Sequence, residues 1–358
     1  TVKQAKQIPV LINYSRGNKR YEKKPDEFDL TLIEYIEKSE IPYWYPTYRM
    51  PEGEESRRND DIGLTHVHHF YTKRNLWVLT KFSEKARKRL SKLLWLVTAC
   101  TEGSSFLNRE RPFGLPSKLS GTLYVSSMIR EINSIEFLRR KVHKYSSYGS
   151  RGLSMVSTDS TTCRKAHSNS VEYVFTDPPF GGNLMYSELN FLWESWLKVF
   201  TNNKPEAIMN NVQQKGLLEY QELMTRCFKE YYRVLKPGRW MTVEFHNSQN
   251  SVWNAIQEAI QRAGFVIADV RTLDKQQGTF KQVTSTGAVK QDLIISAYKP
   301  NGGLEDRFQL EAGTEEGVWD FIREHLKRLP VFTEKNGISE LIVERTDYLL
   351  YDRMIAFH

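Results

Sequence analysis

Cysteine is scarce in this sequence: the 358 residues contain only three, Cys100, Cys163 and Cys227. They are odd in number, far apart and in no Cys-x-x-Cys pair, which argues against a disulfide framework and a cysteine-based zinc site. Long apolar runs are also missing, since the longest, residues 93–97, is far below the roughly 20 residues that cross a membrane. No signal-peptide pattern opens the chain. These absences predict a cytoplasmic protein with no membrane association.

A strong excess of charge of one sign is also lacking. The chain has 51 Lys and Arg against 43 Asp and Glu, a net charge of +8. This mild surplus is compatible with a polyanionic partner but does not establish one. At roughly 150 residues per domain, the length allows two domains, or one large α/β domain with additions.

The first half of the chain divides into two parts. Residues 1–70 are polar and aromatic, and the prolines within 42–51 argue against a long helix or a central strand there, so this segment is expected to be irregular. Residues 71–150 are expected to be helical, because apolar residues recur at 3–4 spacing over 72–100 and 126–145.

The second half alternates between strand and helix patterns. This alternation over residues 151–300 predicts an α/β fold with a mostly parallel sheet and helices on its faces. Residues 301–358 are expected to form a helical tail, because 344–358 has apolar residues spaced like a helix face. Both ends look cut, which indicates a segment of a longer protein. The predicted strands are 171–175, 240–245, 265–270 and 292–298, and the predicted helices are 186–199, 218–235 and 253–263.

One short motif carries chemistry: Thr176-Asp177-Pro178-Pro179-Phe180 directly follows the first predicted strand. Ligands of such sheets bind at the carboxyl ends of the strands. The prolines fix the backbone and have no N–H group, so the motif offers a carboxylate, rigid carbonyl acceptors and a flat apolar ring. This combination suits a planar group that carries an NH₂. The structural alternative is a rigid turn with Phe180 in the core.

Asp-Pro-Pro-Phe at a strand end resembles the catalytic motif of amino-directed DNA methyltransferases, which methylate adenine N6 or cytosine N4. Residues 176–197 resemble the DUF1156-like DNA methylases of bacteria and archaea. Further segments agree with this family in order along the chain, namely 70–76, 233–238, 245–247, 292–298 and 348–354.

The resemblance implies an S-adenosylmethionine-dependent methyltransferase (Rossmann-like) fold and methyl transfer to a DNA base that is flipped out of the duplex. It implies catalytic roles for Asp177, Pro178, Pro179 and Phe180. The Asp177 side chain and the Pro178 carbonyl would accept hydrogen bonds from the base amine while Phe180 stacks on the base. Asp rather than Ser at the first motif position favours adenine N6. A restriction-modification role is one implied context.

The glycine-rich turn, Asp-x-Phe-x-Gly-x-Gly, that usually holds the cofactor in this fold is not recognisable. Residues 101–105 and 149–152 are the nearest candidates, and neither follows a convincing strand. The expectation is therefore that this turn lies upstream of Thr1.

The other site residues are predicted mainly from where they stand in the sequence relative to the motif, and each could instead have a purely structural role. The predicted cofactor contacts are Asp159, Thr176, Asp177 and Asn183, and the predicted substrate contacts are Tyr186, His246, Phe280, Lys281, Lys73 and Arg74. Phe280 could stack on the flipped base, and Lys73 and Arg74 could bind phosphate. His66, His68 and His69 lack a carboxylate at ligand spacing, so no metal site is expected.

Three alternatives stay open. The chain could be an RNA or protein-glutamine amino methyltransferase, a non-catalytic DNA-binding or assembly subunit, or an inactive fragment of an enzyme. The sequence indicates neither the recognition site nor the oligomeric state.

Overall fold

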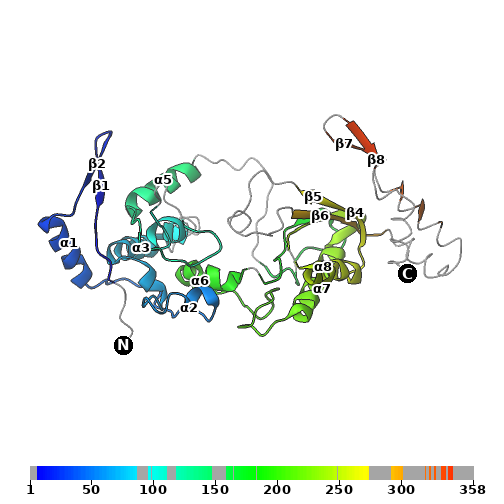
Figure 1. Ribbon diagram of the computed structural model, residues 1–358, viewed down its shortest axis with the longest axis horizontal. Helices are drawn as coiled ribbons and strands as arrows, with labels where there is room; N and C mark the ends of the chain where they lie inside the picture. Colours follow the sequence, from blue (N-terminus) through cyan, green and yellow to red (C-terminus); the bar gives the residue numbers. More distant parts are fainter. Residues whose placement is uncertain are drawn as a thin grey trace. The chain divides into compact units, whose positions relative to one another are not determined.

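The structure is a computed structural model of the 358-residue chain (Figure 1). It describes residues 6–86, 96–97, 99–110, 118–146, 159–163, 165–182, 184–247, 249–273, 292–300, 319, 322–323, 326–327, 332–335 and 338–341. The chain divides into two compact units. Unit 1 contains Thr1–Met155 and Met185–Asn203, and unit 2 contains Val156–Leu184 and Lys204–His358.

Unit 1 is mainly helical and has its own apolar core. Phe70, Leu79 and Leu192 are completely buried in this core. Within the described residues of either unit, no helix combines the length and apolarity that crossing a membrane requires. The elements of unit 1 are β1 (Ile12–Arg16), β2 (Lys19–Lys23), α1 (Glu27–Lys38), α2 (Glu54–Arg57), η1 (Val67–Phe70), α3 (Lys73–Ala86), η2 (Ala99–Ser104), α5 (Ser134–Ser146) and α6 (Tyr186–Leu197).

Three elements of unit 1 differ from the sequence-based expectation, namely the hairpin β1–β2 and the helices α1 and α5, and side-chain caps explain where the two helices begin. Residues 1–70, expected to be irregular, contain the hairpin β1–β2 and the 12-residue helix α1. Asp26 and Asp29 form a capping box that begins α1. The helix expected from residue 126 begins instead at Ser134, because the Asn133 side chain accepts hydrogen bonds from the backbone N–H groups of Ile135 and Glu136 at 3.0 and 3.2 Å.

Unit 2 contains a four-stranded sheet in the order β3-β4-β6-β5. Strands β3 and β4 pair in parallel, and β6 pairs antiparallel with both β4 and β5. Strands β3, β4 and β5 therefore run in one direction and β6 in the other, which makes this a mixed sheet. The elements of unit 2 are β3 (Val171–Thr176), α7 (Leu217–Val234), β4 (Leu235–Phe245), α8 (Asn250–Arg262), β5 (Val266–Leu273), β6 (Asp292–Tyr298), β7 (Phe332–Lys335) and β8 (Ile338–Leu341).

The predicted α/β class is confirmed, but the expectation of a mostly parallel sheet is wrong, because only one of the three described strand pairs of this sheet, β3–β4, is parallel. Helix α8 joins β4 to β5, as in a parallel crossover connection. Strands β5 and β6 follow each other in the chain and pair antiparallel, and an antiparallel pair needs no crossover helix. In the tail expected to be helical, the described residues 319, 322–323 and 326–327 are helical, whereas β7 and β8 form an antiparallel hairpin. The helix face predicted at 344–358 lies outside the described residues.

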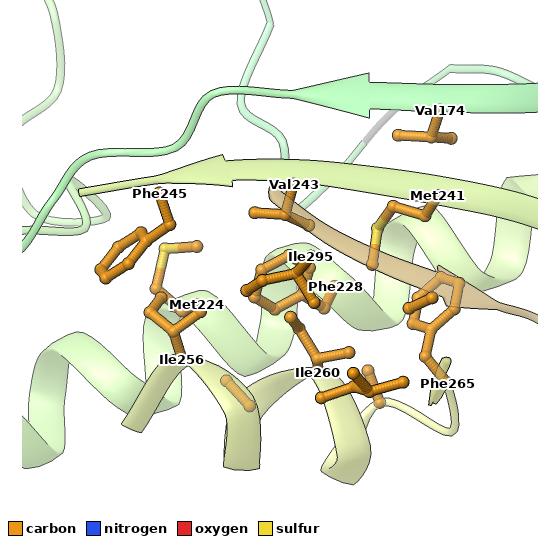
Figure 2. Packing of buried hydrophobic residues seen from close by; sticks show 14 of the residues in the cluster. Val174, Met224, Phe228, Met241, Val243, Phe245, Ile256, Ile260, Phe265 and Ile295 are labelled. Carbon is orange, nitrogen blue, oxygen red and sulfur yellow. The ribbon is translucent and has the colours of Figure 1, made fainter. Parts of the chain in front are cut away.

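The core of unit 2 fills the space between one face of this sheet and helices α7 and α8. Figure 2 shows Val243 of β4, Phe228 of α7, and Ile256 and Ile260 of α8 meeting there, and all four are completely buried. The sheet residues of this core alternate along β4, as expected for a strand with one face on a core. This packing fixes the strand ends that carry the site described below.

One buried lysine ties several elements of unit 2 together. Lys299 directly follows β6, and its Nζ donates to the carbonyls of Tyr232 and Leu235 at 2.8 and 2.9 Å and to Oδ1 of Asn169 at 2.7 Å. A cation at the carboxyl end of a helix also interacts favourably with the unpaired carbonyls there. Lys299 therefore closes the end of α7 and holds the segment that leads into β3.

We expect Lys299→Met to lower the free energy of unfolding by about 2–4 kcal/mol, because it leaves buried carbonyls without a charged donor while keeping the aliphatic volume. Urea denaturation monitored by circular dichroism measures this. Lys236→Met is the control: Lys236 pairs with Glu172 on the surface, so its loss should cost about 0–1 kcal/mol. Equal losses for the two variants would contradict the role given to Lys299.

Candidate active site

The Asp-Pro-Pro-Phe motif lies at the carboxyl end of β3, within unit 2. Thr176 is the last residue of β3 and pairs with Val243 of β4. Asp177 is exposed, Pro178 is buried, and Pro179 and Phe180 are half-buried. Asp177 therefore lies at the surface of the unit.

Two hydrogen bonds hold the backbone of the motif. The Tyr220 hydroxyl, from α7, donates to the Pro179 carbonyl at 2.5 Å, and the Asn247 side-chain amide donates to the Phe180 carbonyl at 2.7 Å. Burial raises the pKa of Tyr220 above its ordinary value, so its hydroxyl stays protonated as the donor. Within the described part of the chain, no hydrogen bond reaches the Pro178 carbonyl. The sequence predicts that the carbonyls of both prolines are available as acceptors. The Pro179 carbonyl is occupied by Tyr220, whereas the Pro178 carbonyl accepts no hydrogen bond from the described residues.

The Phe180 ring is held by residues at the end of β4. It meets the Phe245 ring edge to face at 5.4 Å between centroids and the His246 ring at 6.1 Å. The His246 Nδ1 lies 2.8 Å from Oδ1 of Asp292, the buried first residue of β6. Residues from three strands therefore converge on one edge of the sheet and fix the aromatic part of the motif.

Glycine is required directly after the motif. Gly181 adopts φ = +84°, a conformation that side chains rarely take, and a Cβ there would lie 3.2 Å from Cγ1 of Val252. A Cβ on Gly182 would lie 3.1 Å from the Met209 carbonyl. The chain therefore turns sharply against the segment around Met209, whose N–H donates to the Gly181 carbonyl at 3.3 Å. This turn completes the rigid loop of residues 177–182.

The arrangement offers an exposed carboxylate, a carbonyl that accepts no hydrogen bond from the described residues, and an aromatic ring in a fixed orientation. Two acceptors and a flat apolar face can bind a planar group through both hydrogens of an NH₂. The bonds from Tyr220 and Asn247 keep this loop in place before any ligand arrives, which reduces the ordering cost of binding.

The predicted cofactor contacts are only partly placed. Thr176 directly precedes Asp177 in the chain, and its Oγ1 lies 3.2 Å from the Tyr231 hydroxyl of α7. Asp159 is exposed and makes no hydrogen bond or ion pair with any residue that the structure describes. Asn183 lies outside the described residues, as does the glycine-bearing segment 149–152. These cofactor roles stay predictions.

The predicted substrate contacts fall on different parts of the chain. His246 is brought to the motif, whereas Phe280 and Lys281 lie outside the described residues. Tyr186, Lys73 and Arg74 belong to unit 1. Lys73 Nζ donates to the Glu37 carbonyl at 3.2 Å, and the Arg74 guanidinium pairs with Glu131 through contacts of 2.5 and 3.2 Å. Both cations thus contact groups of unit 1, and phosphate binding by them stays a prediction.

Sequence reasoning missed the residues that hold the motif. In the sequence, Tyr220 is one residue of the predicted helix 218–235, and Asp292 is the first residue of a predicted strand. Asn247 belongs to the segment 245–247 that resembles the family. A hydrogen bond from a distant residue to a backbone carbonyl leaves no pattern in one sequence, because any donor at the right place in space would serve.

The three neighbouring histidines, His66, His68 and His69, form a cluster of rings in unit 1. The His68 ring lies 4.3 Å from the His69 ring and 5.7 Å from the His66 ring, between centroids. Burial, and then the charges of His69 and His66, lower the pKa of His68 to about 4. Among the described residues, no three His, Cys, Asp or Glu side chains are grouped so that they could hold a metal ion.

The histidine cluster predicts acid sensitivity of unit 1. Because the pKa of His68 is about 4 in the folded chain against 6.5 for an unperturbed histidine, its neutral form stabilises the fold above pH 6.5. We expect this contribution to be lost as the pH falls from 6.5 to 4. Urea midpoints measured across this range should fall less for His68→Phe than for the unchanged chain. A matching effect of His143→Phe, at an exposed histidine, would contradict the assignment.

The hydrogen bond to Pro179 predicts a second stability effect. We expect Tyr220→Phe to lower the free energy of unfolding by about 1–2 kcal/mol, since it leaves the Pro179 carbonyl without its donor. Tyr173→Phe is the control, because Tyr173 is exposed and its hydroxyl donates to Thr242 at 2.7 Å on the surface; its loss should stay within about 0.5 kcal/mol. Denaturation curves that do not separate the two variants would refute the anchoring role of Tyr220.

Residues 171–329 match the family N6_N4_Mtase, described as DNA methylase, over somewhat less than half of the chain. The matched segment contains the Asp-Pro-Pro-Phe motif, Tyr220, Asn247 and Asp292. Among curated proteins, none matches this sequence. The predicted resemblance to amino-directed DNA methylases is thus confirmed for this segment, while the finer DUF1156-like assignment stays a prediction.

Similar solved structures are distant. A proposed DNA modification methylase from Thermus thermophilus is 14% identical over 44% of this chain and 58% of its own, with a TM-score of 0.24. A form of it in complex with S-adenosyl-L-methionine gives 13% identity over 44% and 60%, with a TM-score of 0.25. A SAM-dependent methyltransferase from Methanosarcina mazei is 11% identical over 45% and 76%, with a TM-score of 0.24. This chain therefore spans less than two thirds of the Thermus protein, and scores this low establish no shared fold.

Proposed function

We propose that this chain, whose residues 171–329 match the N6_N4_Mtase family model described as DNA methylase, transfers a methyl group from S-adenosylmethionine to an exocyclic base amine in DNA. The observation that carries the proposal is the strand-end loop of unit 2. It presents the exposed carboxylate of Asp177 and the Pro178 carbonyl, and Tyr220 and Asn247 hold it by hydrogen bonds.

The chemical need for these groups follows from the amine itself. The lone pair of an exocyclic amine is delocalised into the base ring, so the nitrogen is a weak nucleophile. If the Asp177 carboxylate and the Pro178 carbonyl each accept one N–H, they favour the pyramidal nitrogen, which carries positive charge as the new N–C bond forms. Asp177 is also the group that can take up the proton that the amine then loses.

Phe180 would orient the base. Its ring is fixed by Phe245 and His246, so a base stacked on it would present its amine to the neighbouring acceptors. Base stacking on an aromatic ring is worth about 1–3 kcal/mol. Since a base inside a duplex cannot reach such a site, the target base would be flipped out.

S-adenosylmethionine, when bound, supplies an electrophilic methyl group. Thr176 and Asp177 lie together at the end of β3 and are polar groups that fit contacts to its amino-acid part; Asp159 and Asn183 are the other proposed contacts. Among the described residues, no strand is followed by the glycine-rich turn expected for this cofactor.

Adenine N6 is the preferred target in this proposal, because Asp rather than Ser stands at position 177. Cytosine N4 has the same exocyclic NH₂ chemistry and is the nearest alternative. RNA and protein glutamine also present a planar NH₂, so competition among DNA, RNA and peptide substrates separates these activities. A cytoplasmic location and a role in restriction-modification are part of the same proposal.

We expect Asp177→Ala to reduce methyl transfer to DNA at least about 100-fold, the scale associated with losing one preorganised transition-state contact. Transfer of labelled methyl from S-adenosylmethionine to DNA measures it. Asp177→Asn should lose a similar amount, because the amide keeps the shape but not the negative charge. The control is Asp61→Ala, at an exposed carboxylate of unit 1. Full activity of Asp177→Ala would reject the proposed role.

A further inference from the structure

The hairpin β1–β2 of unit 1 has an unusual surface for a structural element. Its five-residue strands pair antiparallel and are joined by a two-residue turn in which Gly17 has φ = +60°. Except at its far end, at Ile12 and Lys23, every residue of the two strands is exposed. An isolated two-stranded hairpin is marginally stable in water. A ribbon with so little burial is therefore a poor stabilising element.

The register brings tyrosines and cations onto one face of the ribbon. Tyr14 lies opposite Tyr21 and Arg16 lies opposite Lys19, and these four positions share a face because side chains alternate along a strand. The two tyrosine rings stack at 5.4 Å between centroids and remain 44% and 40% exposed. We call this set of four residues the ribbon face.

The charges of the ribbon face have no opposite charge paired with them among the described residues. Like charges directly opposite each other destabilise a strand pair. Neither Arg16 nor Lys19 forms an ion pair with any residue that the structure describes. Lys23, one pair further along, contrasts with them, since it contacts Asp26 at 2.9 Å and Asp29 at 2.6 Å. The unpaired cations lie at the turn end, where an external anion has the freest access.

We propose that the ribbon face is a second contact surface for duplex DNA, which it binds through the phosphate backbone. This proposal rests on the proposed function in that it takes DNA as the substrate. The major groove, about 12 Å wide, accepts a two-stranded β-ribbon. Arg, Lys and Tyr side chains are all frequent phosphate ligands. The like-charge pair, which is unfavourable in the free chain, is relieved when phosphates lie against it.

The ribbon contact differs in kind from the strand-end loop of unit 2. Phosphate contacts supply affinity that is independent of sequence and falls as salt rises, whereas a base amine is recognised by the acceptors of Asp177 and Pro178. The ribbon would thus hold the duplex while a base is presented elsewhere. Its residues take no part in the chemical step.

The test is binding of the chain to a fluorescently labelled DNA duplex, followed by anisotropy over a salt series. Two lost phosphate contacts should reduce the slope of log K against log[salt] by about 1.8, at about 0.9 per contact. Arg16→Gln/Lys19→Gln is expected to show this change, together with a loss of affinity of about tenfold or more near ~0.1 M salt. An unchanged slope would overturn the proposal.

Matched variants separate this contact from charge in general and from catalysis. Arg226→Gln/Lys229→Gln removes two exposed cations from α7 and should leave the slope nearly unchanged; an equal change would overturn the assignment to the ribbon. Asp177→Ala should bind DNA with the full salt slope. The salt-slope test of the ribbon face can therefore be interpreted even if the methyltransferase proposal fails. Circular dichroism of each variant confirms folding. Tight binding of the chain to anionic lipid vesicles, with none to DNA, would show that the ribbon serves a membrane surface and would refute the proposal.

Discussion

The chemistry of the site depends on one constraint: side chains from other segments hold the backbone of residues 177–181 in place. The Tyr220 hydroxyl donates a hydrogen bond to the Pro179 carbonyl, and the Asn247 amide donates one to the Phe180 carbonyl. Those two carbonyls already accept hydrogen bonds. The Pro178 carbonyl, next to Asp177 in the chain, accepts none from the described residues and is therefore the one that a ligand can use. A loop that could relax would satisfy its own acceptors, and the chemical character of the site would be lost.

The sheet explains how donors from distant segments reach this loop. Strands β3 and β4 are parallel, so their carboxyl ends lie at one edge, and the reversed direction of β6 brings its first residue, Asp292, to the same edge. Helix α7 packs on the core below and supplies Tyr220. The apolar core of unit 2 therefore positions polar groups that are far apart in the sequence, which is how a fold contributes to preorganisation.

Local pattern predicted where the strands lie but not their directions, since β6 runs antiparallel to its neighbours, and it did not predict the contacts that anchor the motif. β6 occupies the same residues that its apolar run predicted, and α6 and α7 begin within one residue of the expected positions, because strong periodicity reports burial directly. The capping box at Asp26 and the cap at Asn133 are local signals in the sequence that composition and apolar spacing alone do not report. The roles of Tyr220 and Asp292 were not readable, since their partners are backbone or side-chain atoms of other segments. The motif itself was recognisable because its chemistry is contained in consecutive residues.

The central claim is that the strand-end loop directs methylation to an exocyclic NH₂ of a DNA base. The most direct measurement supplies the protein with methyl-labelled S-adenosylmethionine and duplex DNA, digests the DNA to nucleosides, and identifies the labelled product by mass spectrometry. The account predicts label on N6-methyladenine, or on N4-methylcytosine if the base preference is reversed. Label on 5-methylcytosine, or DNA without label while RNA or protein becomes methylated, would contradict it.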